Sequence, residues 1–307
     1  MPDTESPAVA RRRVRLALRA ARLAKKLTQS QVARAMDWSL SKVIRIEKGE
    51  VNVSPSDLKV LLNHLDVTDP DKVRALLDDA RVSRQERWTV NPGDREHITP
   101  ALIELVQFEA VATAVRYYAT LVIPGPLQTP EYAEAIFANS PLGFDPATIA
   151  ARIDLRQRRR QLLYRKDAPT NYVLLDESVL YRLIGGAKVM AEQFNLLLTI
   201  MAETSIRVRV IPLDRANLLQ FLGPFTLVDL EEGKSAIVYR ESPGQDEIVQ
   251  TQSEVARHRR TFDQIWDLAL DHAESVKLLA RRAAQLKSQA AEAGSESVQL
   301  GSELRDQ

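Results

Sequence analysis

Residues 27–49 read LTQSQVARAMDWSLSKVIRIEKG, the most strongly patterned stretch of the chain. Thr28 and Ser39 are residue types that cap the N-terminus of a helix, and each precedes a run with helical spacing. Gly49 stands where a helix commonly ends in the left-handed conformation. The stretch therefore predicts two short helices joined by a tight turn, and the second helix presents a polar, cationic face.

The segments on either side of this stretch also read as helices. Apolar residues recur at positions i, i+4 and i+7 in the preceding segment, which predicts a helix over about residues 9–26. The dipeptides Ser-Pro at 54–55 and Asp-Pro at 69–70 each place a capping residue before a proline, as at the start of a helix. Five short helices over residues 8–82 indicate a compact all-α domain that contains the helix-turn-helix.

The charge of the chain is unevenly distributed. The whole chain of 307 residues has a net charge of only +1. Residues 8–49 contain twelve Lys and Arg and two acidic residues, so this segment carries +10 and the remainder about −9. Affinity for DNA depends on the local potential facing the phosphates rather than on the net charge of the chain. The basic segment therefore predicts double-stranded DNA as a partner.

The two helices of the patterned stretch present the groups that DNA recognition needs. The side-chain amide of Gln29 and the backbone N–H groups at a helix start suit a phosphate oxygen. The guanidinium of Arg45 can fork onto guanine O6 and N7 in the major groove. The other predicted contacts are to bases from Leu40 and Ser41 and to phosphates from Lys42 and Lys48. The alternative is a pair of amphipathic helices whose charges are only solvated.

The rest of the chain follows a different pattern. Residues 83–98 lose apolar periodicity and are interpreted as a linker, and residues 99–289 alternate helical and strand-like runs. The expected strands are Tyr117–Ile123, Asn171–Leu175, Ile206–Ile211, Phe225–Leu230 and Ala236–Tyr239, followed by helices Glu247–Asp271 and Ser275–Gln289. Residues 290–307 are rich in Ser, Glu and Gln and are predicted to be disordered. The predicted fold is mostly α, with an α+β C-terminal domain around a small sheet.

Several kinds of chemistry are not expected from this sequence. The chain has no cysteine, and its four histidines lack the spacing of metal ligands. Asp176 and Glu177 are adjacent at a strand end, where successive side chains point in opposite directions, so they do not form a catalytic pair. Nucleotide-loop and hydrolase-elbow motifs are absent. We therefore expect no catalytic residue, metal or cofactor, and no enzyme.

The sequence shows neither a membrane-spanning segment nor an export signal. The sequence holds no run of about 18 apolar residues, and residues 1–10 lack the apolar core of a signal peptide. We therefore expect a cytoplasmic protein that does not contact membranes.

Residues 14–66 resemble the XRE helix-turn-helix family, the phage Cro and repressor type. The likeness rests on Leu27-Thr28-Gln29, Val32-Ala33, Ser39, Ser41-Lys42-Val43, Ile46-Glu47 and Gly49. It implies that Gln29 and Ser39 contact the DNA backbone and that Leu40, Ser41, Lys42 and Arg45 lie near bases. It also implies a five-helix, lambda-repressor-like fold and a structural ion pair between Arg22 and Glu47. The expected function is sequence-specific DNA binding in transcription regulation, by a homodimer.

Residues 88–285 resemble the DUF5753 domain. The likeness rests on VIPGPLQTPEYA at 122–133, RQRRRQ at 156–161, LDESVL at 175–180 and GPF at 223–225. Proline at 126 departs from the leucine usual in the first of these motifs. With the helix-turn-helix, the chain is similar to actinobacterial antitoxin-like regulators of the WhiJ type. The resemblance implies, as an alternative function, binding of a small DUF397-type protein together with autoregulation.

An α+β domain joined to a DNA reader commonly senses a small-molecule effector or a protein. The candidate ligand or partner surface comprises Gln128, Tyr132, Arg156, Arg160, Glu177 and Tyr181. The arginine run at 156–160 also fits a solvated helix face with one or two ion pairs, and that alternative stays open.

Overall fold

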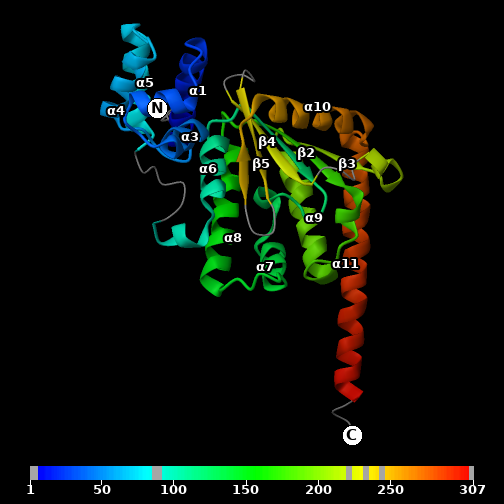
Figure 1. Ribbon diagram of the computed structural model, residues 1–307. Helices are drawn as coiled ribbons and strands as arrows, with labels where there is room; N and C mark the ends of the chain where they lie inside the picture. The colour runs from blue at the N-terminus through cyan, green and yellow to red at the C-terminus, as the bar shows by residue number, and fades with distance from the viewer. Residues whose placement is uncertain (1–5, 85–91, 219–222, 231–234, 242–245, 304–307) are drawn as a thin grey trace. The chain divides into compact units, whose positions relative to one another are not determined.

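The structure is a computed structural model that describes residues 6–84, 92–218, 223–230, 235–241 and 246–303 (Figure 1). It divides into two compact units: Met1–Thr89 with Val106–Val111, and Val90–Leu105 with Ala112–Gln307. Unit 1 contains the predicted helix-turn-helix, and unit 2 contains most of the predicted α+β segment. Part of the predicted 83–98 linker, residues 85–91, lies outside the described residues.

Apart from the first helix, which follows Ser6 without a side-chain capping bond, the helices over residues 6–84 begin directly after the capping residues that the sequence indicates. In four of them a side-chain oxygen of the capping residue accepts a hydrogen bond from a backbone N–H three residues further on. The helices in this described range are α1 (Pro7–Ala24), α2 (Gln29–Ala35), α3 (Leu40–Lys48), α4 (Pro55–His64) and α5 (Pro70–Val82). The predicted five-helix arrangement of this part is confirmed.

The core of unit 1 is formed by the apolar stripe of each helix. Leu18 of α1, Leu58 of α4 and Leu62 of α4 are almost fully buried and lie in one cluster with Val43 and Ile46 of α3. Helices as short as α2 and α3 are marginal in water by themselves. Their stability therefore comes from this shared core, which also determines which face of α3 remains outside.

Unit 2 is organised around a mixed sheet whose order in the described residues is β3-β2-β1-β4-β5-β6. The strands are β1 (Ala114–Ala119), β2 (Thr170–Asp176), β3 (Arg207–Ile211), β4 (Phe225–Leu230), β5 (Ser235–Arg240) and β6 (Glu247–Val249). β1, β2 and β3 are parallel, whereas β4, β5 and β6 extend the sheet antiparallel from β1. The carboxyl ends of β1, β2 and β3 therefore meet at one edge.

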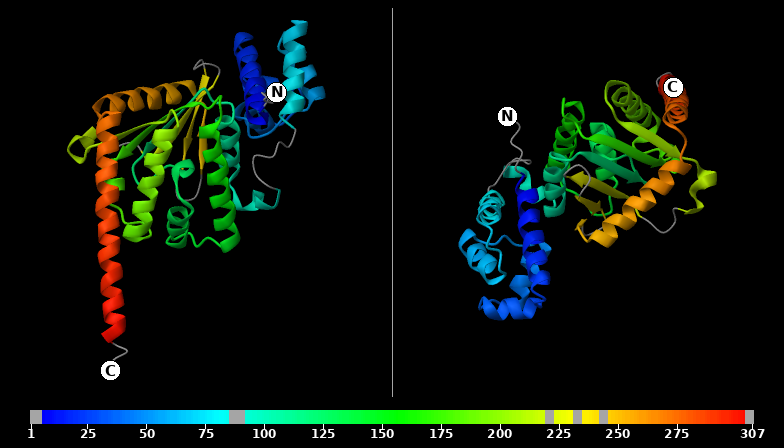
Figure 2. Two further views of the ribbon diagram at one scale, coloured as in Figure 1. Left: turned by 180° about the vertical axis from the view of Figure 1, so that it is seen from behind. Right: turned by 90° about the horizontal axis from the view of Figure 1, so that it is seen from above.

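Helices cover both faces of this sheet (Figures 1 and 2). α10 packs on one face against a cluster that includes Tyr118, Leu174 and Phe225. α8 and α9 lie on the other face, and α11 packs along α9. The α-helices outside residues 6–84 are α6 (Pro100–Glu109), α7 (Pro130–Ala138), α8 (Pro146–Gln161), α9 (Gly186–Glu203), α10 (Gln252–Leu268) and α11 (His272–Glu303). Short 3₁₀ turns are η1 (Pro92–His97), η2 (Gly125–Leu127), η3 (Leu162–Tyr164), η4 (Glu177–Leu180) and η5 (Leu213–Leu218).

The predicted fold class is confirmed, but three element boundaries differ from expectation. The strand expected at Tyr117–Ile123 is β1, which lies at Ala114–Ala119. Beyond it the chain leaves the sheet, because side chains satisfy its backbone: Ile123 N–H donates to the Tyr132 hydroxyl oxygen at 3.3 Å, and Gln128 Nε2 donates to Ile123 O at 2.6 Å.

The other two differences concern the C-terminal helices. Glu247–Val249, expected to begin a helix, pairs as β6 with β5, and α10 begins only at Gln252. Residues 290–303 of the tail expected to be disordered continue α11, and residues 304–307 lie outside the described residues. Residues 289–293 read QAAEA, and Ala, Gln and Glu favour helix. None of the helices in the described part of the chain is long and apolar enough to cross a membrane.

Candidate nucleic-acid interface

The α2–turn–α3 segment is shaped by local hydrogen bonds. Thr28 and Gln31 form a reciprocal capping box, in which Thr28 N–H donates to Gln31 Oε1 at 2.8 Å and Gln31 N–H donates to Thr28 Oγ1 at 3.2 Å. Ser39 Oγ accepts from Lys42 N–H at 3.1 Å, so this predicted backbone contact acts as a helix cap in the unbound protein. Between the helices Asp37 has φ +54°, a left-handed conformation that Asp tolerates better than most residues.

The end of α3 requires a glycine. Gly49 has φ +81°, and an added Cβ would lie 3.1 Å from Arg15 Cδ. Both the backbone conformation and the close approach of α1 therefore disfavour a side chain here. This C-cap holds the last turn of α3 against α1.

α3 exposes one face and buries the other. Val43 and Ile46 are buried in the unit 1 core, whereas Leu40, Ser41 and Arg45 are exposed. Leu40, although apolar, has 43% of its surface exposed. An exposed face that combines a hydroxyl, a guanidinium and an apolar side chain suits the donors, acceptors and thymine methyls of a major groove.

A hydrogen-bonded network joins the first three helices. Arg22 Nε and Nη2 donate to the two carboxylate oxygens of Glu47 at 2.5 and 2.9 Å, and Gln29 Nε2 donates to Glu47 Oε2 at 2.9 Å. Arg22 Nη1 also donates to Leu27 O at 2.7 Å. The bond with Glu47 raises the pKa of Arg22 above its ordinary value. The ion pair implied by the family resemblance thus also orients Gln29 at the start of α2.

The cationic residues among the predicted contacts each have an acidic partner. Lys42 Nζ lies 3.3 Å from Asp57 Oδ2 and 3.8 Å from the centre of the Trp38 ring. Arg45 and Lys48 both face Glu50, at 3.7 and 3.8 Å. Sequence reasoning missed Asp57 and Glu50, although Glu50 directly follows the glycine that ends α3. These carboxylates compete with DNA phosphates for the same cations.

In unit 2 the candidate surface residues Gln128 and Tyr132 are buried. Gln128 is 3% exposed, and its two amide atoms bond Ile123 O and Arg156 Nε. Tyr132 is fully buried, and this burial raises the pKa of its hydroxyl to about 12. Their observed contacts stabilise the turn before α7, so they do not form an open surface.

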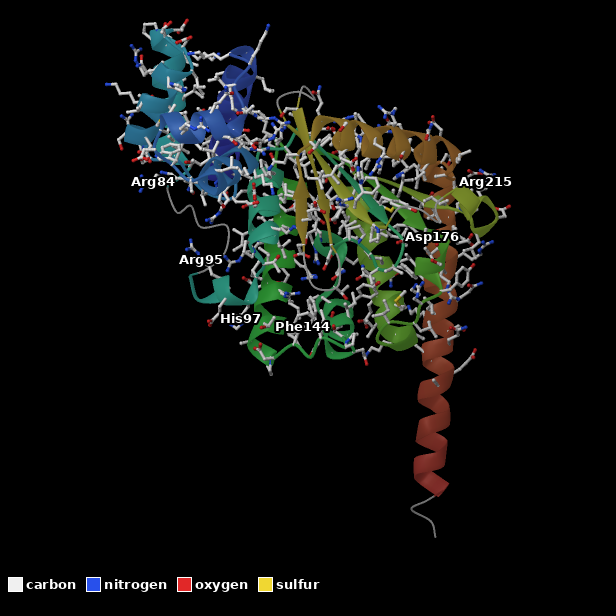
Figure 3. The ribbon with its side chains drawn as sticks, viewed as in Figure 1. Arg84, Arg95, His97, Phe144, Asp176 and Arg215 are labelled. Atoms are coloured by element: carbon white, nitrogen blue, oxygen red, sulfur yellow. The ribbon has the colours of Figure 1, made fainter. Side chains whose placement is uncertain are left out.

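The arginines of α8 clamp the same turn. Arg160 donates to the carbonyl oxygens of Pro126 and Gln128, and Arg156 donates to Gln128 Oε1 at 2.9 Å. Burial lowers the pKa of Arg156 to about 10. Arg152 donates to His97 O at 3.2 Å and lies over the ring of Phe144. His97 and Phe144 are labelled in Figure 3. Three arginines spaced four residues apart thus lie along one stripe of α8.

Glu177 and Tyr181 lie elsewhere, after β2. Glu177 accepts from Leu213 N–H at 2.9 Å and from the Tyr181 hydroxyl at 3.2 Å. No contact recorded for the described residues joins this pair to Gln128 or to the α8 arginines. The predicted ligand or partner surface therefore separates into a buried turn with its arginine clamp and an edge of the sheet. Within the described ranges, no group of three or more His, Asp or Glu is placed to hold a metal ion.

The capped helix pair and the exposed face of α3 define a DNA-binding helix-turn-helix regulator, and a helix-turn-helix domain family matches residues 14–76. The chain belongs to the DUF5753 family, a domain of unknown function that matches residues 102–281. No curated protein and no solved structure matches the chain.

Proposed function

We propose that this protein is a sequence-specific transcriptional regulator of the XRE type that binds double-stranded DNA as a homodimer. The observation that carries the proposal is α3, whose buried face holds it in the domain while Leu40, Ser41 and Arg45 remain exposed. Two such helices about 34 Å apart would read successive major grooves on one side of a two-fold operator. The DUF5753 domain would receive a ligand or protein signal.

The unbound contacts suggest how DNA engages. Gln29 keeps a second amide N–H for a phosphate oxygen while its first stays on Glu47. When DNA binds, Lys42 exchanges its ion pair with Asp57 for one with a phosphate. Arg45 and Lys48 likewise exchange their ion pairs with Glu50 for contacts with DNA. These exposed ion pairs are worth at most about 1 kcal/mol each, so their exchange for DNA contacts costs little.

Replacing Arg45 with alanine is expected to weaken binding to the specific operator by about 1–3 kcal/mol and to relax recognition at one base position. The measurement is a gel-shift titration on the DNA upstream of the protein's own gene, repeated over a range of salt concentrations. Arg74→Ala is the matched control, because Arg74 is an exposed arginine of the same domain that lies on α5.

Two outcomes would count against this assignment. An equal loss on specific and random DNA would place Arg45 on a phosphate instead of a base. Absence of salt-dependent specific binding by the wild-type chain would contradict the proposed function itself.

A second candidate function is antitoxin-like binding of a small acidic protein, of which a DUF397-type partner is the case implied by resemblance. The arginine stripe of α8 favours it. Arg152, Arg156 and Arg160 have only neutral hydrogen-bond partners among the described residues, and like charges four residues apart on a helix repel. Glu241 supplies part of the countercharge at Arg156, and an acidic partner would supply more.

Triple replacement of these arginines with glutamine is expected to abolish co-purification of a stoichiometric small protein from native cells. Because the same arginines hold the turn before α7, circular dichroism and thermal unfolding check that the variant remains folded. Arg158→Gln is the control, because Arg158 lies on the same helix but pairs with Asp154 at 2.8 Å. Retention of the small protein by the triple variant, or resistance of the complex to high salt, would argue against binding at this stripe.

A further inference from the structure

Exposed apolar side chains follow the carboxyl ends of the three parallel strands. Leu121 follows β1, Tyr181 and Leu183 follow β2, and Leu213 follows β3. Each is between 50% and 55% exposed. Because the three strands are adjacent and parallel, their ends lie within about 10 Å of one another at one edge of the sheet. We call these four side chains the carboxyl-edge surface.

Hydrogen bonds hold the segments of this surface together. Leu213 N–H donates to Glu177 Oε2 at 2.9 Å, which joins the segments after β3 and β2. Arg282 of α11 donates from Nε to Leu180 O at 3.1 Å, and its guanidinium lies 4.9 Å from the centre of the Tyr181 ring. The exposed side chains therefore stand on an ordered frame, and an interface here loses little backbone freedom on forming.

The same segments carry charges of both signs. Their arginines are Arg182, Arg215 and Arg282, and their exposed or partly exposed acids are Glu177 and Asp214. Asp176 is buried and does not contribute to this surface. A surface with a single sign of charge would repel a second copy of itself, whereas a balanced surface is self-complementary. Large apolar side chains among arginines are also typical of the composition of protein–protein interfaces.

We propose that the carboxyl-edge surface is a two-fold interface between two copies of this chain. The inference rests on the proposed function, because a two-fold operator requires a second copy. In a two-fold contact both copies use the same patch, so each charge has to meet an opposite charge elsewhere on that patch. A partner of one dominant charge would match this surface less well than a second copy does.

The test is the self-association of the full chain, measured by sedimentation equilibrium over a range of concentrations. Replacing both Leu183 and Leu213 with glutamate is expected to raise the dimer dissociation constant by roughly 100-fold or more, because two apolar contacts become like charges that face each other. Leu142→Glu is the matched control, because Leu142 is 57% exposed but lies in the connection between α7 and α8. Circular dichroism checks that the variants keep their helix content.

A mixing experiment tests the two-fold geometry directly. Chains with Leu183 and Leu213 replaced by lysine should also fail to dimerise alone, and mixing them with the glutamate chains should restore a one-to-one dimer. A wild-type chain that stays monomeric at every concentration would overturn the proposal. So would a wild-type dimer that the glutamate variant leaves intact, or variants whose mixture does not associate.

DNA-binding measurements distinguish a wrong interface from a wrong proposed function. The glutamate variant keeps its helix-turn-helix, so it should still bind a single half-site with the wild-type salt dependence while losing tight binding to the two-fold site. Loss of half-site binding by the wild-type chain would instead contradict DNA recognition by α3, whatever its oligomeric state.

Discussion

Replacing Glu47 with alanine is expected to destabilise the helix-turn-helix domain by about 3–5 kcal/mol. The carboxylate is only 8% exposed and receives two hydrogen bonds from Arg22 and one from Gln29. Removing it leaves the Arg22 guanidinium, itself 10% exposed, without its counterion. The expected loss is a large part of the stability of an ordinary domain, so DNA binding should fail together with folding.

Hydrogen–deuterium exchange is the suitable measurement, because it reports on α1 to α3 separately from the sheet of unit 2. Asp78→Ala is the control, since Asp78 pairs with Arg81 on the exposed face of α5 and should change stability by less than about 1 kcal/mol. Glu47→Gln keeps a hydrogen-bond acceptor for part of the network, so it should destabilise the domain less than Glu47→Ala does. Equal protection of α1 to α3 in the alanine variant and the wild type would show that the pair contributes little.

Replacing Asp229 with alanine is expected to destabilise unit 2 by about 3–5 kcal/mol. The side chain of Asp229 is 4% exposed and is paired on β4 with both Arg116 of β1 and Arg259 of α10. Burial, together with the nearby Arg259, lowers the pKa of Arg116 below its ordinary value. Without Asp229 two partly buried guanidinium groups would lie close together with their shared counterion gone.

The effect of Asp229→Ala should appear as faster amide exchange in β1, β4 and α10, with α1 to α5 unchanged. The matched control is Glu247→Ala, which removes an ion pair with Arg240 that is exposed on both sides and should cost less than about 1 kcal/mol. Wild-type exchange in β1 and α10 of the Asp229 variant would contradict a central role for this carboxylate. A fall in protection of α1 to α5 would point to a general loss of folding instead.

The parts of the fold that sequence predicted correctly depend on short-range physics. Thr28, Ser39 and Gly49 act through hydrogen bonds and backbone conformation within a few residues, so their types alone indicate where α2 and α3 begin and end. β6 and the end of β1 were misplaced for the opposite reason. Glu247–Val249 forms a strand only because β5 offers it a partner.

The candidate site shows the same difference between short-range and long-range determinants. Which side chains of α3 face outward follows from helical periodicity, so the exposed face could be read in advance. The acidic partners of those side chains could not be predicted, because Lys42 contacts Asp57 only when α4 packs beside α3. Gln128 and Tyr132 were expected at a surface, yet the crossing of α8 and α9 over their turn buries them.

By itself the sequence determined the helix-turn-helix, its caps, its basic charge and the presence of a second, mixed domain, because each depends on composition or on neighbours along the chain. Only the tertiary structure decided which distant groups meet. Asp229 contacts Arg116 across 113 residues, and the carboxyl ends of β1, β2 and β3, which Leu121, Leu183 and Leu213 follow, meet at one edge. Contacts between such distant residues depend on strand order and helix packing, which cannot be predicted from local sequence spacing.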